Sequence, residues 1–389
     1  MENFIYEYPT KVLFGKGIAK EQLSNALKAY GNRIMLAYGG GSIKNNGIYN
    51  EITGILKNDG KEVIDFSGIM SNPTYAKVQE GAALAKEKNV DFILAVGGGS
   101  VIDCCKIISV QAKTSEDIWD MEFVQGKFPT ESIPVGAVVT ASGTGAEMNA
   151  GAVITNEALK IKTGVLGATP CFAVLDPEYT MSVPKSQVIS GAFDTLSHAM
   201  ETYFGQSDKD NASDDIAEAV MKNTIRNMRT LLTDINDYTA RSNLMWDSAM
   251  AENGILKLGR KTAFQAHQIE HQLGAYTDCN HGQGLAVIHP VYYKHIYKYG
   301  LSKFARFAVN VWGISAEGKS DEELALAGID ALADFIKECG LPTHLEELKT
   351  KAKITEDMLK EAADSTNIIQ TGYGVLTHEE IYRILKECI

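Results

Sequence analysis

The sequence contains no long apolar run, and none of its apolar segments approaches the ~20 residues that a helix needs to cross a bilayer. Its first ten residues, MENFIYEYPT, lack the basic segment and the apolar stretch that together mark a secretory signal. These absences argue against a membrane-spanning protein and against export. We therefore expect a cytoplasmic protein with no membrane partner.

Disulfide and zinc-thiolate patterns are also missing. The chain has six cysteines, two of them adjacent at Cys104 and Cys105, but it has no C-x-x-C pair and no dense regular spacing. This usage favours reduced thiols over a disulfide framework. A block of positive charge is absent too, because the 37 Lys and Arg residues are scattered and the net charge is −12. The sequence therefore predicts no nucleic-acid partner.

The chain is long enough, at 389 residues, for two domains that each bury an apolar core. From about residue 30 to residue 185, short β-branched apolar runs alternate with longer amphipathic stretches, which is typical of parallel strands covered by helices. Beyond Pro184 the apolar period stays near 3.6, and a capping box at Thr377–Glu380 precedes the last helix. We predict an α/β domain over 1–185 and an all-helical domain over 186–389.

Glycine-rich turns follow three of the predicted strands. The strands are Arg33–Tyr38 and Val90–Val96, each followed by GGGS, and Ile133–Thr140, followed by ASGTG. Ligands bind at such strand ends in α/β sheets, and glycine lets backbone N–H groups approach a phosphate closely. The second turn, which precedes a predicted helix, therefore predicts a dinucleotide site. The alternative is that a glycine triplet only makes a tight turn.

The first glycine turn bears on which dinucleotide binds. It consists of Gly39, Gly40, Gly41 and Ser42. NAD-selective domains often carry a carboxylate in this region for the ribose 2′-hydroxyl, and none is present here. The available room, the hydroxyl and the nearby cation of Lys44 suit a 2′-phosphate, so we predict NADP(H) in preference to NAD(H). The alternative for Lys44 is an ordinary solvated lysine.

Histidines at helical spacing form a second group of candidate site residues, after the glycine turns. Asp194 and His198 lie one helical turn apart, so that both side chains can bind one ion; the alternative is a solvated polar face. His267 and His271 repeat this spacing, and His281 follows on a glycine-flanked loop. A single shared metal site explains why four of the eight histidines fall in these two segments. We treat the remaining four as structural: His289, His295, His344 and His378.

Four motifs occur in a fixed order: GGGSxxD at 97–103, TxSGTGxE at 140–147, DxxxH at 194–198, and H-x3-H-x9-H at 267, 271 and 281. Together they resemble the iron-containing, group III alcohol dehydrogenases, and specifically the NADP-dependent butanol dehydrogenase and aldehyde reductase branch. The likeness covers nearly the whole chain. It implies a dehydroquinate synthase-like fold, in which a Rossmann-like dinucleotide-binding α/β domain with a parallel sheet precedes an all-α metal-binding domain. It also implies a homodimer or larger homo-oligomer.

The resemblance further assigns residues. It implies a divalent ion, Fe²⁺ with Zn²⁺ as the alternative, held by Asp194, His198, His267 and His281. It places His271 beside the substrate. For the nucleotide it implies contacts from the glycine turns and from single residues elsewhere: Asn72, Gly97, Gly98, Gly99, Ser100, Asp103, Thr140, Thr144 and Lys162. One departure is Thr371–Leu376, which stands where other branches carry an Asn-Pro-Arg turn.

The implied chemistry is hydride transfer between NADP(H) and a primary alcohol or aldehyde, such as butanol and butyraldehyde. Three neutral imidazoles and one carboxylate leave a dication net positive with an open position, so it can polarise a carbonyl oxygen. His271 can relay a proton to the nascent alkoxide. The alternatives are polyol oxidation of the glycerol dehydrogenase kind, and a metal-dependent hydrolase or lyase on the same scaffold. A non-catalytic nucleotide sensor gives no reason for four convergent ligands.

Overall fold

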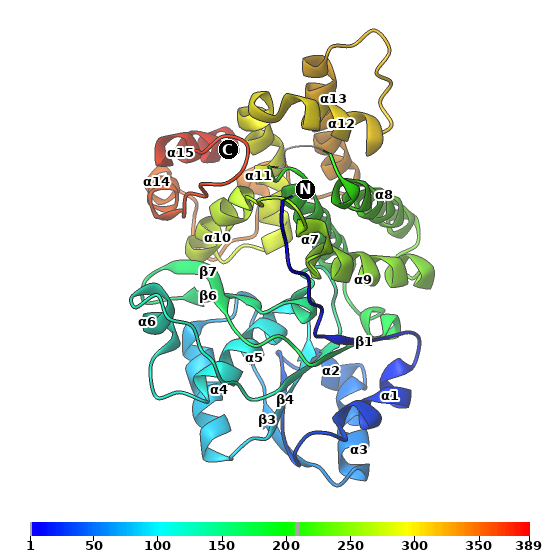
Figure 1. Cartoon of the computed structure of the whole chain (residues 1–389), viewed down its shortest axis with the longest axis vertical. Helices are drawn as coiled ribbons and strands as arrows, with labels where there is room; N and C mark the ends of the chain where they lie inside the picture. Colours follow the sequence, from blue (N-terminus) through cyan, green and yellow to red (C-terminus); the bar gives the residue numbers. More distant parts are fainter. Residues whose placement is uncertain (1, 207–209) are drawn as a thin grey trace. The chain divides into compact units, whose positions relative to one another are not determined.

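The computed structural model describes residues 2–206 and 210–389. The chain divides into two compact units, whose elements are labelled in Figure 1. One unit is Glu7–Pro184, and the other consists of Met1–Tyr6 and Lys185–Ile389. The N-terminal segment belongs to the second unit, where the backbone N–H of Glu2 donates to the carbonyl of Gly259 at 3.2 Å.

The unit Glu7–Pro184 is built on a six-stranded parallel sheet with the order β1-β8-β5-β4-β2-β3. Its strands are β1 (Lys11–Phe14), β2 (Arg33–Tyr38), β3 (Glu62–Phe66), β4 (Phe92–Gly97), β5 (Val135–Val139) and β8 (Phe172–Leu175). Strands β4 and β5 are buried along their whole length, which is why both are continuous apolar runs. The predicted parallel sheet is thus confirmed.

Helices lie on both sides of this sheet (Figure 1). They are α1 (Ile18–Leu27), α2 (Ser42–Asn45), α3 (Ile48–Asn58), α4 (Tyr75–Glu87), α5 (Gly99–Gln111) and α6 (Ile118–Phe123), with short 3₁₀ turns η1 (Ala146–Met148) and η2 (Pro177–Thr180). Apolar residues of α1 and α3, such as Leu23 and Ile52, share one buried cluster with Ile34 and Leu94 of the sheet. Helices α4 and α5 pack against each other.

An antiparallel hairpin departs from the predicted succession of parallel strands. It consists of β6 (Gly151–Asn156) and β7 (Ile161–Leu166). Its turn includes Lys160 in the left-handed region, at φ 53°, so it lacks the glycine that usually marks such a turn. The hairpin is anchored where the N–H of Thr155 donates to the carbonyl of Pro73 at 2.9 Å.

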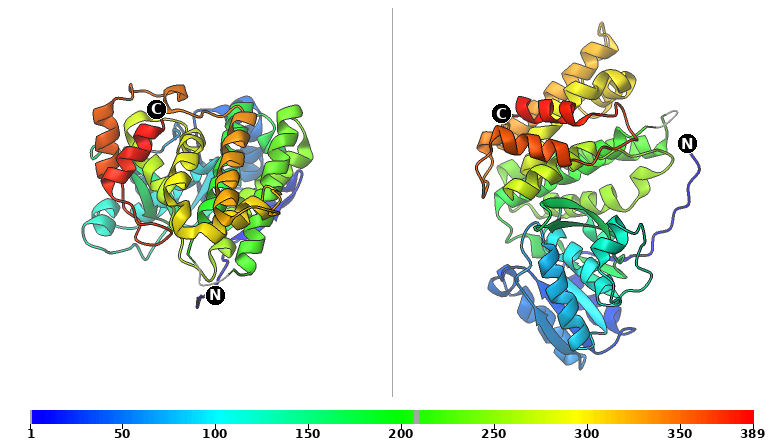
Figure 2. Two further views of the ribbon diagram at one scale, coloured as in Figure 1. Left: turned by 90° about the horizontal axis from the view of Figure 1, so that it is seen from above. Right: turned by 90° about the vertical axis from the view of Figure 1, so that its left-hand side faces the viewer.

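The second unit is helical, as predicted. Its elements are α7 (Lys185–Tyr203), α8 (Ala212–Thr233), α9 (Tyr238–Glu252), η3 (Ile255–Lys257), α10 (Gln265–Thr277), α11 (His281–Ile296), η4 (Tyr297–Gly300), α12 (Leu301–Asn310), α13 (Asp321–Glu338), η5 (Leu345–Glu347), α14 (Glu356–Ser365) and α15 (His378–Glu387). The predicted capping box joins Thr377 and Glu380 at the start of α15. Helices α12 and α13 pack side by side (Figure 2). Across the described ranges, no helix has both the length and the apolar character for a membrane span.

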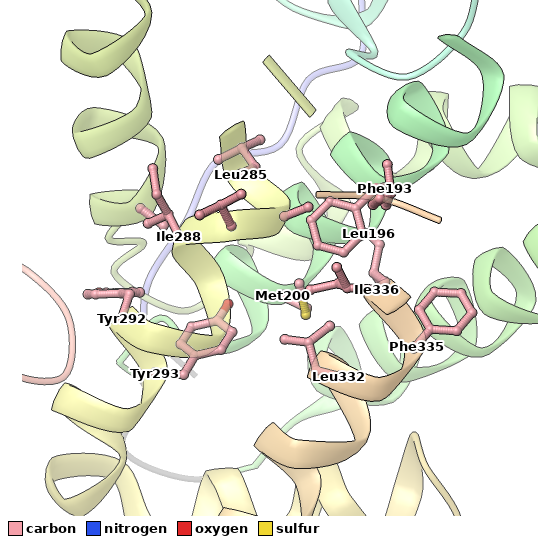
Figure 3. Close-up of a cluster of buried hydrophobic side chains, with 14 of the residues drawn as sticks. Phe193, Leu196, Met200, Leu285, Ile288, Tyr292, Tyr293, Leu332, Phe335 and Ile336 are labelled. Atoms are coloured by element: carbon pink, nitrogen blue, oxygen red, sulfur yellow. The ribbon is translucent and has the colours of Figure 1, made fainter. Parts of the chain in front are cut away.

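The core of the helical unit fixes how α7 is rotated. Phe193, Leu196 and Met200 of α7 enter a buried cluster together with side chains of α11 and α13, such as Leu285 and Leu332 (Figure 3). Burying a side chain of this size contributes about 1.5–3 kcal/mol. Because these residues hold one face of α7 in the core, the polar residues between them must project from its other side.

Candidate metal and nucleotide sites

Helix α7 carries the first two of the four predicted metal ligands. Asp194 and His198 are both buried, and Nε2 of His198 lies 3.8 Å from Oδ1 of Asp194. The i, i+4 spacing brings the two side chains together, as predicted from the sequence. Helix α7 therefore presents an acid and an imidazole side by side.

Asp194 Oδ1 is also the point on which α10 and α11 converge. Nε2 of His267 lies 3.7 Å from it, and Nε2 of His281 lies 3.5 Å from it. One ligand atom from each of Asp194, His267 and His281 falls in a group whose members all lie within 4.8 Å of one another. His198 lies outside this tighter group, with its ring stacked on that of His267 at 4.6 Å between centroids.

These separations suit a shared ion better than hydrogen bonds. A hydrogen bond between these atoms would be about 2.7–3.2 Å long. A tetrahedral ion with ligand bonds of about 2.1 Å holds its ligand atoms about 3.4 Å apart. Within the described residues, Oδ1 of Asp194 and Nε2 of His267 are buried without a hydrogen-bond partner. Three imidazoles and one carboxylate also form a donor set that suits Fe²⁺ and Zn²⁺, so the residues present fit a divalent metal.

The pKa values of the clustered residues also favour a bound cation. Burial alone would raise the pKa of Asp194, but His198 and His281 outweigh it and lower that pKa to about 2. Burial lowers the pKa of His198. Burial would likewise lower the pKa of His267, but Glu201 and Asp194 raise it to about 10, because Glu201 bonds the ring directly. The carboxylates thus favour positive charge at this point, and a dication supplies it without a proton.

Two further carboxylates contact the ring nitrogens that face away from Asp194. Glu201 bonds Nδ1 of His267, and Glu270 bonds Nδ1 of His281. Both glutamates are buried, at 3% and 0% exposure. Neither glutamate was predicted from the sequence to belong to the site. The available signal was spacing, because each follows a site histidine by three residues: Glu201 follows His198, and Glu270 follows His267.

His271 lies beside this group, one turn along α10 from His267. Its ring centroid is 6.0 Å from that of His267 and 5.5 Å from that of His281. It forms a second grouping with Glu270 and His281, and it is not part of the group around Asp194. The structure thus places His271 next to the predicted ligands without adding it to them.

Glycines flanking His281 let the start of α11 approach its neighbours. A Cβ on Gly282 would lie 2.2 Å from the carbonyl oxygen of Ser190 on α7, and one on Gly284 would lie 2.9 Å from Cγ of Glu270. Asn280 caps α11 by accepting from the N–H of Gln283 at 3.1 Å. Only residues without a side chain allow this close packing, which seats His281 at the first turn of α11.

In the α/β unit, two predicted glycine turns lie at adjacent strand ends. Strand β2 pairs with β4, and the chain leaves β2 toward β3 but leaves β4 toward β5, on the opposite side. The turns 39–42 and 97–100 therefore flank the switch point of the sheet, where such folds bind nucleotides. Helix α5 begins at Gly99, so its first N–H groups are available for an anion.

The turns after β4 and β5 contact each other closely. The N–H of Thr140 donates to the carbonyl of Gly97 at 2.9 Å. A Cβ on Gly99 would lie 2.2 Å from Oγ1 of Thr144, and one on Gly98 would lie 3.3 Å from Cβ of Ala141. A Cβ on Gly40, in the other turn, would meet nothing within 4 Å. The turns after β4 and β5 are thus packed against each other, whereas a Cβ at Gly40, in the turn after β2, would face open space.

The remaining predicted nucleotide contacts are distributed around these turns. Ser42 begins α2 and Ser100 lies in the first turn of α5. Nζ of Lys44 lies over the rings of Tyr38 and Tyr49, at 5.0 and 4.7 Å from their centroids. Lys44 is therefore held at the end of β2 by aromatic contacts.

Three other predicted contacts lie near the hairpin. The carboxylate of Asp103 accepts from the N–H of Val153 at 2.9 Å, which ties α5 to β6. Lys162 is buried on β7 opposite Thr155. Thr155 forms a bridge with Thr74, which adjoins the turn at Asn72. Asn72 and Lys162 are thus brought near the same residue of β6.

The parallel sheet carries glycine turns at its switch point, where such folds bind a nucleotide. In the helical unit, three imidazoles surround a buried carboxylate. These two features are typical of a metal-dependent, nicotinamide-linked oxidoreductase. Residues 9–177 match the iron-containing alcohol dehydrogenases, and residues 188–389 match the C-terminal part of the Fe-containing alcohol dehydrogenase family. The chain therefore belongs to the iron-containing alcohol dehydrogenase family. It is an alcohol/aldehyde oxidoreductase, and the family implies an NAD(P) nucleotide and iron or another metal.

Individual relatives agree with this assignment. The chain is 38% identical over 390 residues to NADH-dependent butanol dehydrogenase A of Clostridium acetobutylicum, with 100% of both chains covered. It is 35% identical over 354 residues to the NADPH-dependent aldehyde reductase YqhD of Escherichia coli, covering 89% of each. A crystal structure of NADH-dependent butanol dehydrogenase A from Thermotoga maritima has a TM-score of 0.92 and 36% identity, covering 100% of this chain and 99% of that one. The predicted fold class and family resemblance are thus confirmed.

Proposed function

We propose that the protein transfers a hydride between NADP(H) and a primary alcohol or aldehyde, such as butanol and butyraldehyde, at a divalent metal. The observation that carries this proposal is the placement of Asp194 Oδ1 between 3.5 and 3.8 Å from ring nitrogens of three histidines. A buried carboxylate surrounded in this way fits a bound cation. The relatives named as butanol dehydrogenase and aldehyde reductase support the substrate class.

The metal would be held by Asp194, His198, His267 and His281, and the family supports Fe²⁺ with Zn²⁺ as the alternative. When bound, it supplies a fixed positive charge that stabilises negative charge on the substrate oxygen. His271 lies beside these residues and is proposed to exchange a proton with that oxygen at a ring nitrogen. The chain's own residues thus provide the ion's ligands and an adjacent proton carrier.

The glycine turns are proposed to bind the nucleotide, which supplies or accepts the hydride. The N-terminus of α5 and the hydroxyls of Thr140 and Thr144 suit the pyrophosphate or the carboxamide. Two observations support NADP(H) over NAD(H): the open space at Gly40, and the cation of Lys44, which lies over the ring of Tyr38 at the end of β2. The named relatives include both NADH- and NADPH-dependent proteins.

We further propose that residues 1–185 bind the nucleotide and residues 186–389 bind the metal. The partner is a small-molecule alcohol or aldehyde, and the assembly is a homodimer or larger homo-oligomer. A cytoplasmic location is supported by the six free cysteines, of which five are buried.

The test is a matched set of oxidation assays. The purified protein is loaded with Fe²⁺ or Zn²⁺, and oxidation of NADPH and of NADH is followed with straight-chain aldehydes and with a polyol-derived ketone. We expect metal-dependent oxidation, faster with NADPH, and fastest with the aldehydes. Tight metal binding without oxidation of either nucleotide would contradict the proposal and favour a hydrolase.

A further inference from the structure

The outer ring nitrogens of two proposed ligands are each bonded by a buried carboxylate. Glu201 of α7 bonds Nδ1 of His267, and Glu270 of α10 bonds Nδ1 of His281. We infer that Glu201 and Glu270 are positioning residues that fix the orientation and tautomer of these two imidazoles for metal binding. This inference rests on the proposed function, because it concerns the same metal site.

The tautomer follows from the chemistry of the two partners. An ionised carboxylate can only accept hydrogen bonds, so the facing Nδ1 must carry the proton. In a neutral imidazole the lone pair then lies on Nε2, which is the atom that faces Asp194 in both His267 and His281. A metal ligand needs that lone pair. Each outer carboxylate therefore selects the one neutral tautomer that can bind an ion at Asp194.

Glu201 has a second role in the same place. One of its carboxylate oxygens accepts from the N–H of Ala266 at 2.8 Å, and the other accepts from the N–H of His267 at 3.1 Å. These are N–H groups of the first turn of α10, and Phe264, at its N-cap position, provides no side-chain cap. Glu201 therefore caps α10 from α7. The start of α10 and the ring of His267 are held by one carboxylate.

Glu270 contacts residues at the start of α11 and just before it. Its Oε2 faces His281, while its Oε1 lies 3.7 Å from Sγ of Cys279. Gly284 leaves room for its side chain, since a Cβ there would lie 3.1 Å from Oε1. The carboxylate is thus enclosed by the loop that leads into α11.

Three matched substitutions test the inference. Glu201→Met and Glu270→Met remove the acceptor, and Glu252→Met makes the same change at another buried glutamate, which pairs with Lys257 at 2.9 Å. Zn²⁺ alone is the probe, with affinity measured by chelator competition. We expect the first two variants to lose about 10- to 100-fold in affinity. Glu252→Met should lose much less. Equal losses in all three would show a general effect of charge and overturn the inference.

A conservative variant separates positioning from charge. Glu270→Gln is neutral like Glu270→Met, but its amide oxygen can still accept from Nδ1 of His281. It should therefore recover most of the affinity that Glu270→Met loses. Failure of this rescue would show that the charge matters and the hydrogen bond does not.

A spectroscopic readout tests the tautomer itself. Nitrogen-15 spectra of the Zn²⁺-loaded, histidine-labelled protein should show protonated Nδ1 and metal-bound Nε2 for His267 and His281. In Glu270→Met only the signals of His281 should lose this pattern. Unchanged histidine signals in that variant would overturn the inference. This measurement stands even if Glu201→Met fails to fold.

The outcomes distinguish the inference from the proposed function. If the wild-type chain binds no Zn²⁺ or Fe²⁺, the proposed function fails. If wild type binds one ion and both Met variants bind it equally well, only the inference fails. If wild type binds two ions and Glu270→Met binds one, Glu270 is itself a ligand, in the grouping it forms with His271 and His281, and the inference is also overturned.

Discussion

Asp194 and His281 come from helices far apart in the sequence, yet Oδ1 of the first lies 3.5 Å from Nε2 of the second. The packing of α7 against α11 brings them together, and Gly282 permits the approach because a side chain there would strike Ser190. The separation is too long for a hydrogen bond and close to that of two ligands on one ion. The core of the helical unit thus builds the cluster around Asp194.

Asp194→Asn should abolish metal binding while preserving the fold. The amide is neutral and a weaker ligand, and the cluster loses the charge on which its histidines converge. We expect a loss of affinity beyond the ~10- to 100-fold typical of residues behind the ligands. Metal analysis and chelator competition measure it, and circular dichroism checks the fold. Asp247→Asn, at a buried aspartate held by Asn223 and Thr224, is the control and should retain metal.

His271→Ala should separate chemistry from metal binding. His271 adjoins the predicted ligands without joining the group around Asp194, so the ion should stay. Loss of a proton carrier lowers turnover by about 10²–10⁴-fold. The measurements are turnover and metal stoichiometry on the same sample. Loss of metal along with activity would make His271 a ligand.

The sequence was sufficient for features that depend on local pattern. Strand β2 has the bounds predicted from its apolar run, and β4 is a continuous buried strand followed by its glycine turn. The spacing of Asp194 and His198 placed both on one side of α7, since helical geometry alone determines that relation. Such features need no knowledge of the neighbouring elements.

Features that depend on tertiary packing were missed. In the sequence, Glu201 is not distinguished from the other polar residues of α7. Its partners Ala266 and His267 lie on α10, so its role is visible only once the packing of the two helices is known. The β6–β7 hairpin was missed for a local reason. Its turn at Lys160 adopts positive φ without Gly, Asn or Asp, so the usual sequence signal is absent.

Gly40→Ala should weaken nucleotide binding without affecting stability. A Cβ at Gly40 meets nothing within 4 Å of protein, so the fold has room for it. A bound phosphate would occupy that space, and we expect roughly a tenfold weaker Kd, equivalent to about 1.4 kcal/mol. Calorimetry gives the Kd, and melting temperature checks stability. Gly54→Ala, also in open space but on α3, should leave the Kd unchanged.

Lys44→Ala should reduce the preference for NADPH. Charge-assisted contacts to a phosphate are worth about 10- to 100-fold in affinity, and NADH lacks the 2′-phosphate. We therefore expect kcat/KM to fall by about that factor with NADPH and to stay nearly constant with NADH. Lys57→Ala, an exposed lysine in the last turn of α3, is the control. An equal fall for both nucleotides would contradict a role for Lys44 in recognising the 2′-phosphate.

Glu147 should make stability depend on pH. Burial raises its pKa to about 7 in the folded chain, although Lys106 partly opposes this. The folded state therefore holds a proton that the unfolded state releases near pH 4.5. The resulting stability is fully present below that pH and is lost as pH rises through about 7, by a total on the order of 3 kcal/mol.

Glu147→Gln removes this dependence because the amide does not ionise. Its melting temperature should exceed that of wild type by several degrees at pH 8 and match it at pH 4. Asp247→Asn provides an internal comparison, because burial raises the pKa of Asp247 to about 6. The difference in melting temperature between this variant and wild type should therefore appear about one pH unit lower than the difference for Glu147→Gln. If both differences in melting temperature appear over the same pH range, neither can be assigned to its own carboxyl group. The buried charge of Glu147 would then not be the cause of the pH-dependent stability.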